Sequence, residues 1–319
     1  MTPRTKKRLL LVTVLPLLLA LGAELYLRTQ VPTCGVTPFR ISQRAGLASE
    51  FRPGFTTTYK GFEVSYNSDG YRGPELPQRA EGLPRIALVG DSFVYGSAVD
   101  LPDTLAVRLE RALGEAQVLN LGVPGYSAEN VAAVVQHDAL RLDPDIVLYV
   151  YFANDSDPPS SFESIPEDAV IDGMYQFPGH SALLQWINVR VKHLALTSFG
   201  VQLARLTPAD SRTLWENGGG QRVRGAIENM RDLCAAKGIR FLVAGYPYLT
   251  LVEQNPFRPL DEGAAAVCAE LGVEWVDLVE AFDGERDLSS YWASVFDTHP
   301  NGAANAKAAA HLAPYLLAK

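Results

Sequence analysis

Four short motifs carry residue types that can together perform acyl transfer. Gly90-Asp91-Ser92 offers a hydroxyl, Gly122 lies in a glycine-rich turn, Asn154 offers a side-chain amide, and a final motif contains Asp297 and His299. A serine hydroxyl becomes a useful nucleophile when a base removes its proton, and a neutral imidazole suits that task near pH 7. A carboxylate can orient the imidazole, and amide N–H groups can stabilise the negative charge of the intermediate. The four motifs in this order favour nucleophilic catalysis over unrelated turns.

The segments that must position these motifs alternate between short apolar runs and helical patterns. The apolar runs predict five strands, at 85–89, 118–121, 146–152, 239–244 and 274–278. Helices are expected around 105–113, from 127 to 140 with Ser127 as cap, at about 222–236 and 261–271, and after Asn301. Apolar strands alternating with helices imply an α/β fold, a three-layer α/β/α sandwich around a central, mostly parallel sheet of about five strands. Ligands bind such sheets at the carboxyl ends of the strands, where three of the motifs lie.

In order and type, the motifs resemble those of the SGNH, or GDSL-type, serine hydrolases over about three quarters of the chain. The resemblance implies a flavodoxin-like SGNH hydrolase fold, with Ser92 as nucleophile, His299 as general base and Asp297 as the partner of His299. It also implies an oxyanion hole made by the backbone N–H of Ser92, the backbone N–H of Gly122 and the side chain of Asn154. An esterase acting through an acyl-enzyme at Ser92 is therefore expected.

Two positions differ from the family pattern. Phe152 stands two residues before Asn154, where the family commonly has glycine, and Phe296 stands three residues before the histidine, where the family often has aspartate. Competing motifs are incomplete: Gly179-His180-Ser181 lacks the closing glycine of a nucleophile elbow, and no phosphate loop, dinucleotide fingerprint or His-Glu-x-x-His sequence occurs. Neither a cofactor nor a metal is expected.

The N-terminal 28 residues differ in charge from the rest of the chain. They hold five basic residues and one acid, and their charge-free run at 9–23 is rich in leucine. A basic flank before an apolar run is typical of an exported protein, either tethered by a single span (1–28) or released after cleavage of a signal peptide. The net charge of −8 thus divides into +4 for this segment and −12 for the remainder. An acidic excess argues against nucleic-acid binding and favours a neutral or cationic ester substrate.

The remainder divides into an arm and a domain. Residues 29–83 are expected to be an irregular arm, although the turn-rich run at 67–74 resembles the lead-in of membrane-anchored bacterial family members. Residues 84–319 are expected to form the catalytic domain, with an insertion at about 156–218, including a helix-like stretch at 181–204, that shapes a substrate pocket. Three cysteines, Cys34, Cys234 and Cys268, allow at most one internal disulfide, and the last two are expected to be buried in helices.

The prediction for function is an extracytoplasmic serine esterase or acyl hydrolase acting on a small-molecule or glycan ester. Two alternatives stay open. The same site could pass the acyl group to a hydroxyl of an envelope glycan, or the protein could be a catalytically silent binding or scaffold protein of envelope assembly. The oligomeric state is left open.

Overall fold

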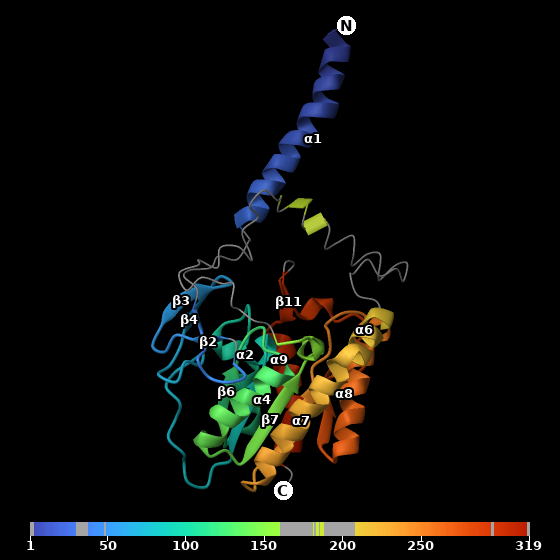
Figure 1. The fold of residues 1–319 in the computed structure, drawn as a ribbon. Helices are drawn as coiled ribbons and strands as arrows, with labels where there is room; N and C mark the ends of the chain where they lie inside the picture. The colour runs from blue at the N-terminus through green and yellow to red at the C-terminus, as the bar shows by residue number, and fades with distance from the viewer. Residues whose placement is uncertain are drawn as a thin grey trace.

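Five parallel strands form the central sheet in the order β6-β5-β7-β8-β9 (Figure 1). The computed structural model describes residues 3–29, 38–47, 49–159, 181, 183–184, 186–187, 208–294 and 297–317. The sheet strands are β5 (Arg85–Gly90), β6 (Gln117–Gly122), β7 (Ile146–Tyr151), β8 (Arg240–Gly245) and β9 (Glu274–Asp277). All five predicted strands are present, and the predicted α/β fold with a central parallel sheet is confirmed. The strand order reverses next to β5, so the carboxyl ends of β5 and β7 border the crevice where such sheets bind ligands.

Helices cover both faces of the sheet because successive strand residues point to opposite sides. Ile86 and Leu88 join one apolar cluster with residues of α3 and α9, whereas Ala87 and Val89 join a second cluster with residues of α4, α7 and α8. The covering helices are α3 (Leu105–Leu113), α4 (Ala128–His137), α7 (Gly220–Ala235), α8 (Arg258–Leu271) and α9 (Gly302–Leu317). This arrangement is the predicted three-layer sandwich.

The predicted helix boundaries hold where side chains cap the helix ends. Ser127 and Asn130 form a capping box at the start of α4, and the side chain of Asn301 accepts hydrogen bonds from two N–H groups at the start of α9. Gly272 ends α8 with φ +66°. The helix predicted at 127–140 is shorter, because α4 ends at His137 and the 3₁₀ turn η2 (Ala139–Leu142) follows it.

Short elements connect the layers at the edge where the strands end. They are α2 (Ser92–Tyr95), η1 (Leu101–Asp103), η3 (Ala153–Ser156), α6 (Pro208–Leu214), the π-helical η5 (Trp215–Gly219), η6 (Val252–Gln254), η7 (Leu278–Phe282), η8 (Ser289–Tyr291), β10 (Trp292–Ser294) and β11 (Asp297–Pro300). The elements α6 and η5 lead directly into α7, which therefore begins before residue 222. Most of the predicted 156–218 insertion and of its 181–204 helix lies outside the described residues.

The cysteines follow the prediction as far as the structure describes them. Cys234 and Cys268 are buried and free in α7 and α8, and burial raises the pKa of each thiol to about 12. Cys34 lies outside the described residues, as do Phe296, Gly179 and His180.

Residues 38–83 differ from the expected irregular arm. They contain two hairpins, formed by β1 (Phe39–Ile41) with β2 (Ser49–Phe51) and by β3 (Thr56–Tyr59) with β4 (Phe62–Ser65). Their apolar side chains belong to the same buried cluster as α4 and the sheet; these include Phe51, Tyr59, Val64, Tyr66 and Tyr71. The strands are only three or four residues long, too short for an alternating pattern to stand out from the sequence.

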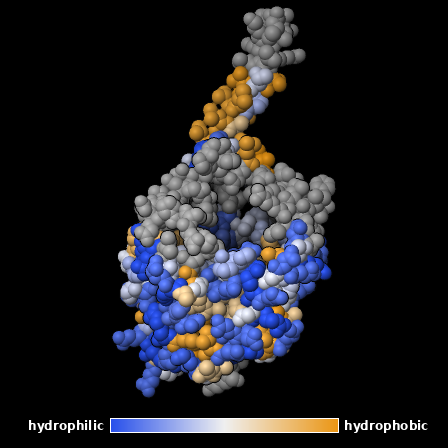
Figure 2. All heavy atoms as spheres, in the orientation of Figure 1, coloured by the Kyte–Doolittle hydropathy of each residue, from blue (hydrophilic) through white to orange (hydrophobic). Residues whose placement is uncertain are grey.

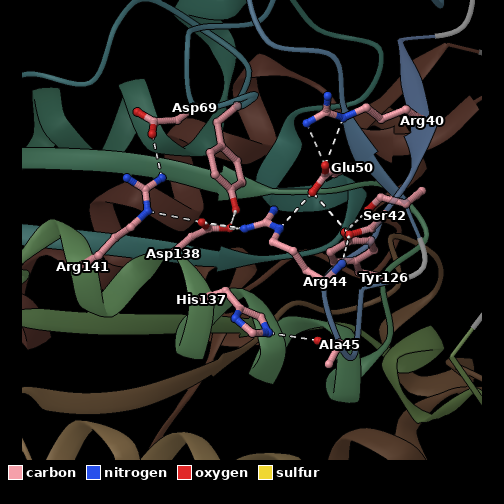
Figure 3. Close-up of polar contacts among 12 residues, drawn as sticks. Arg40, Ser42, Arg44, Ala45, Glu50, Asp69, Tyr126, His137, Asp138 and Arg141 are labelled. Atoms are coloured by element: carbon pink, nitrogen blue, oxygen red, sulfur yellow. Dashed lines mark hydrogen bonds and ion pairs between the residues drawn. The ribbon is translucent and has the colours of Figure 1, made fainter.

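A network of ion pairs attaches the first hairpin to the domain (Figure 3). Arg44 donates to Glu50 in β2 and, through Nη1, to both carboxylate oxygens of Asp138 at 2.8 Å. Asp138 also accepts from the hydroxyl of Tyr71 at 2.6 Å and from Arg141, which in turn binds Asp69. Opposite charges are matched within this network, so it serves as an attachment of residues 38–72 to α4 and η2.

The N-terminal helix α1 (Pro3–Thr29) projects away from the sandwich (Figure 1). Figure 2 shows the coloured part of its surface as mostly hydrophobic, in contrast to the largely hydrophilic visible face of the body. Within it, residues 12–29 are long and apolar enough to cross a membrane, a property that signal sequences share. Near the C-terminal end of α1, Glu24 accepts hydrogen bonds from the Ser181 hydroxyl and the Leu183 N–H.

Candidate active site

The strand β5 delivers Ser92 to the carboxyl edge of the sheet through a tight turn. Asp91 caps α2 by accepting a hydrogen bond from the Phe93 N–H at 2.9 Å, so Ser92 is the first residue of that helix. Gly90 has φ +158°, and a Cβ there would lie 2.6 Å from Val94 and 2.8 Å from a backbone carbonyl oxygen of β7. Only glycine fits this turn, which leaves the Ser92 hydroxyl at the end of the strand.

The histidine and the aspartate of the last motif come to this hydroxyl from the β10–β11 hairpin. His299 Nε2 lies 2.9 Å from Ser92 Oγ, and His299 Nδ1 lies 2.5 Å from Asp297 Oδ1. With the proton on Nδ1 donated to the carboxylate, Nε2 is the acceptor for the serine hydroxyl. Asp297 Oδ1 also accepts the backbone N–H of His299 at 3.0 Å, which fixes the two residues relative to each other. The structure thus brings together the three residues that the sequence singled out.

A lysine from the second hairpin completes the surroundings of Asp297. Lys60 Nζ lies 2.8 Å from Asp297 Oδ2 and 3.3 Å from His299 Nδ1, and both the lysine and aspartate side chains are 3% exposed. Burial by itself raises the pKa of Asp297, but the hydrogen bond and charge of His299, together with the charge and hydrogen bond of Lys60, outweigh it. The pKa of Asp297 is therefore held well below its usual value, and this carboxyl is ionised.

Two further carboxyl groups, those of Asp91 and Asp155, are buried near Ser92. Asp155 accepts a hydrogen bond from the Tyr149 hydroxyl at 2.7 Å, and Asp91 lies 3.2 Å from the Ser92 hydroxyl. Burial, and next the negative charge of Asp91, raise the pKa of Asp155 well above its ordinary value. Burial also raises the pKa of Asp91, against the hydrogen bond of the Phe93 N–H, the charge of His299 and the hydrogen bond of Asn154. Two neighbouring buried carboxyls favour the protonated form of at least one of them.

Gly122 lies at the expected strand end, but its N–H is directed to the side chain of Asn120. It donates to Asn120 Oδ1 at 3.0 Å, and a Cβ on Gly122 would lie 2.3 Å from the Tyr95 nitrogen. Gly122 is thus a close-packing position between β6 and α2. In the same turn Gly125 has φ +78° and is the one exposed residue between 121 and 128.

Asn154 follows β7 in the turn η3, at the same edge of the sheet as Ser92. Its amide forms a hydrogen bond with Asp91, and its Oδ1 is buried without a hydrogen-bond partner among the described residues. The side chain is therefore next to the turn that carries Ser92, and its Oδ1 has an unused capacity to accept a hydrogen bond there.

Aromatic rings form one wall beside the serine. Phe93 stacks on Phe152 with ring centroids 4.0 Å apart, and it meets Tyr246 edge to face at 5.0 Å. The imidazole of His299 tilts against Phe93 at 5.5 Å. Phe152, the residue that departs from the family pattern, is thus part of an apolar surface that reaches the histidine.

Lys60 and Arg72 are the polar residues of the site region that sequence reasoning missed. The Lys60-Gly61 pair between two short runs is a turn signal that could have indicated the second hairpin. Nothing local indicates that Lys60 meets a residue 237 positions later. Arg72 is buried and donates to the carbonyl oxygens of Tyr95, Gly96 and Val99 around the end of α2. In the part of the chain that the structure describes, no group of three or more histidine, cysteine or acidic side chains could hold a metal ion.

Residues 88–307 match the model of a family described as the GDSL-like lipase/acylhydrolase family. No match is found among curated proteins. Similar solved structures include a lipase/acylhydrolase from Enterococcus faecalis, 17% identical with a TM-score of 0.44, over 73% of this chain and 95% of that chain. Another is a GDSL-like lipase from Bacteroides thetaiotaomicron VPI-5482, 13% identical with a TM-score of 0.42, over 76% of this chain and 91% of that one. The family match includes Ser92 and His299 but begins after the hairpin that carries Lys60.

Proposed function

The chain belongs to the GDSL-like lipase/acylhydrolase family, and from that premise we propose that it is a serine esterase that cleaves carboxylic esters through an acyl-enzyme at Ser92. The observation that carries the proposal is the continuous hydrogen-bonded series from Asp297 through His299 to the Ser92 hydroxyl. The aspartate is ionised, the imidazole can accept a proton at Nε2, and the hydroxyl lies within hydrogen-bond distance of that atom.

In the proposed reaction, His299 takes the proton of Ser92 as the serine oxygen attacks the ester carbonyl. The ionised Asp297 holds the ring and stabilises the imidazolium that forms. His299 then donates this proton to the leaving alkoxide, and the acyl group remains on Ser92. A water molecule, activated by the same imidazole, releases the acid and restores the serine.

The oxyanion of the tetrahedral intermediate needs N–H donors beside Ser92. We assign this role to the Ser92 N–H and the Asn154 amide, and we propose Gly125 in place of Gly122 as the third donor. Support for Gly125 is its exposure in a buried turn at the carboxyl edge, together with the engagement of the Gly122 N–H by Asn120. Each well-placed donor lowers the activation free energy by about 3 to 4 kcal/mol.

The substrate side of the site is apolar near the histidine. Because Phe152 is partly exposed and stacks on Phe93, we propose that it contacts the acyl chain or an apolar alcohol group. An excess of acidic residues in the chain favours a neutral or cationic ester.

We infer that α1 places the sandwich on the outer side of a membrane. Support comes from the apolar residues 12–29 and from the basic residues that precede them in the sequence. A tethered protein stays in the membrane fraction after alkaline carbonate washing. A cleaved protein is soluble, and its measured mass is that of a chain beginning near residue 23.

The decisive experiment is fluorophosphonate labelling of the purified full-length protein in detergent, beside Ser92→Ala and His299→Ala. Ser97→Ala is the matched control, since Ser97 is also a buried serine close to α2. Label and hydrolysis of short-chain aryl esters are expected in the parent and in the control, and neither in the two site variants. Absence of Ser92-dependent label together with absence of hydrolysis contradicts the proposal.

A further inference from the structure

The turn between β3 and β4 aims a lysine into the site from a distant part of the chain. Lys60 has φ +51° and the following Gly61 has φ +87°, which are the values of a type I′ hairpin turn. Tyr59 and Phe62 pair directly across it, so the turn consists of two residues. The Lys60 side chain is almost fully buried, with its ammonium group 2.8 Å from Asp297 Oδ2.

The two oxygens of Asp297 have different partners. Oδ1 accepts both the ring Nδ1–H and the backbone N–H of His299, while Oδ2 accepts from Lys60. Rotation of the carboxylate therefore breaks a hydrogen bond on one side or the other. Lys60 is thus placed to hold the carboxylate in the orientation that the imidazole requires.

The charge of Lys60 has a second effect. A carboxylate without a balancing cation attracts an adjacent imidazolium strongly in a buried site, because the surroundings screen charges weakly. An imidazolium held in this way gives up its proton less readily, although the leaving alkoxide must receive that proton. An ammonium group on the other carboxylate oxygen offsets this attraction.

We propose that Lys60 is a positioning residue of the catalytic site, which orients Asp297 toward His299 and balances its charge so that His299 is a neutral base over a wider pH range. The proposal rests on the proposed function of Ser92 and His299. It extends the site to a hairpin that precedes the first strand of the sheet.

Steady-state kinetics against pH on the full-length protein test this role. Lys60→Met removes the ammonium group, and Glu63→Gln is the matched control because it removes an exposed charge from the same hairpin. We expect Lys60→Met to lower kcat by about 10 to 100-fold with little change in KM. We also expect the acid limb of the pH profile to move upward by about one pH unit. Lys60→Arg, which keeps the charge, should leave the acid limb close to that of the parent.

If Lys60 only stabilises the fold, the kinetics of its variants will differ from these expectations. If Lys60→Met lowers activity without moving the acid limb, or if Glu63→Gln causes the same loss, the proposal is wrong. Should Lys60→Met fail to fold, Lys60→Gln takes its place, since glutamine keeps a donor toward Asp297 without the charge. An unmoved acid limb in Lys60→Gln overturns the proposal in the same way.

NMR titration of the histidine rings tests the relationship without any substrate. His299→Gln identifies the signals of His299 among the five histidines. Lys60→Met or Lys60→Gln should raise the titration midpoint of that ring, whereas Glu63→Gln should not. If the parent shows no Ser92-dependent labelling, the proposed function fails while the titration still decides the role of Lys60. If labelling occurs but the midpoint does not move, only the inference about Lys60 fails.

Discussion

The guanidinium group of Arg72 lies over the ring of Tyr95, with 5.1 Å between Cζ and the ring centroid, and donates to the carbonyl oxygen of Gly96 at 2.5 Å. It also donates to Val99 at 2.7 Å. Tyr95 is the last residue of α2, which begins with Ser92, so a buried cation supports the far end of the helix that carries the proposed nucleophile. The Tyr95 hydroxyl in turn lies 2.7 Å from the Tyr66 hydroxyl of the hairpin segment.

Replacement of this cation should loosen the nucleophile turn. Arg72→Met leaves three carbonyl groups without their donor, and we expect a loss of about 3 kcal/mol in the free energy of unfolding. The value of kcat should fall by about tenfold as the position of Ser92 becomes less defined. Urea denaturation and steady-state kinetics measure the two effects. Arg286→Met is the control because Arg286 is 85% exposed, and an equal loss there would contradict the assignment.

Asp297→Asn should show how much the negative charge of this side chain contributes, because asparagine has nearly the same size without the charge. The amide cannot stabilise the imidazolium and favours the wrong ring tautomer, so kcat should fall by about 10³ to 10⁴-fold. It also leaves the Lys60 ammonium buried without its carboxylate, and the melting temperature should drop. The exposed Asp283→Asn serves as control. Activity within tenfold of the parent would show that the carboxylate of Asp297 is dispensable.

The low pKa of Asp297 also predicts a loss of stability in acid. The pKa of this carboxyl is lower in the folded state than in the unfolded chain, where it is about 4. Its contribution to the free energy of unfolding is therefore complete above about pH 4. This contribution is lost as the pH falls toward the lower pKa of Asp297 in the folded state. Acid denaturation followed by circular dichroism should show Asp297→Asn with a weaker dependence on pH below 4 than the parent. Equal slopes would contradict the ion pair.

Asp155 should have the opposite pH dependence. Its raised pKa means that the folded state keeps a proton that the unfolded chain loses above about pH 4. Stability therefore declines as the pH rises from that value toward the folded pKa, by up to about 1.4 kcal/mol per pH unit. Asp155→Asn can still accept from Tyr149, so it should flatten this decline and raise stability at pH 7. Denaturation midpoints between pH 4 and 8 measure it, with exposed Asp143→Asn as control; a slope unchanged by Asp155→Asn would contradict the assignment.

Truncations should distinguish a tether from a structural segment. Removal of residues 1–37 deletes α1 but keeps both hairpins, and the product should fold and keep esterase activity. Removal of residues 1–83 deletes Lys60, Arg72 and the buried aromatic side chains of Phe51 and Tyr66, and it should yield an unfolded or inactive chain. Circular dichroism and aryl ester hydrolysis compare the two. Full activity without residues 1–83 would show that the hairpins are dispensable.

The sheet could be predicted because its determinants are local. Runs such as Ile146 to Tyr151 are apolar on every residue, and caps such as Ser127 and Asn301 mark helix starts within a few positions. The motif of Asp297 and His299 was recognisable because the two residues are neighbours in sequence. The hairpins escaped prediction because their strands have three or four residues, and their register depends on packing against α4 rather than on their own pattern.

The position of Lys60 and the engagement of Gly122 escaped prediction for a related reason. A lysine in a two-residue turn is ordinarily a solvated surface residue, and only the folded chain brings it to Asp297. The Gly122 N–H was expected to face Ser92, yet the side chain of Asn120, two residues earlier, accepts it. The first is a tertiary contact that no periodicity or motif encodes. The second depends on the orientation of the Asn120 side chain, whose Nδ2 donates to the Val94 carbonyl oxygen at 2.9 Å.

The ion pair between Lys60 and Asp297 also constrains how the protein is made. The two residues lie 237 positions apart, so a ribosome has synthesised nearly the whole domain before Asp297 emerges. Contacts between such distant segments form late, because chain entropy must be lost before they contribute. A nascent or prematurely terminated chain that lacks β11 carries Ser92 without its base. Esterase activity should therefore appear only when synthesis has passed the last hairpin.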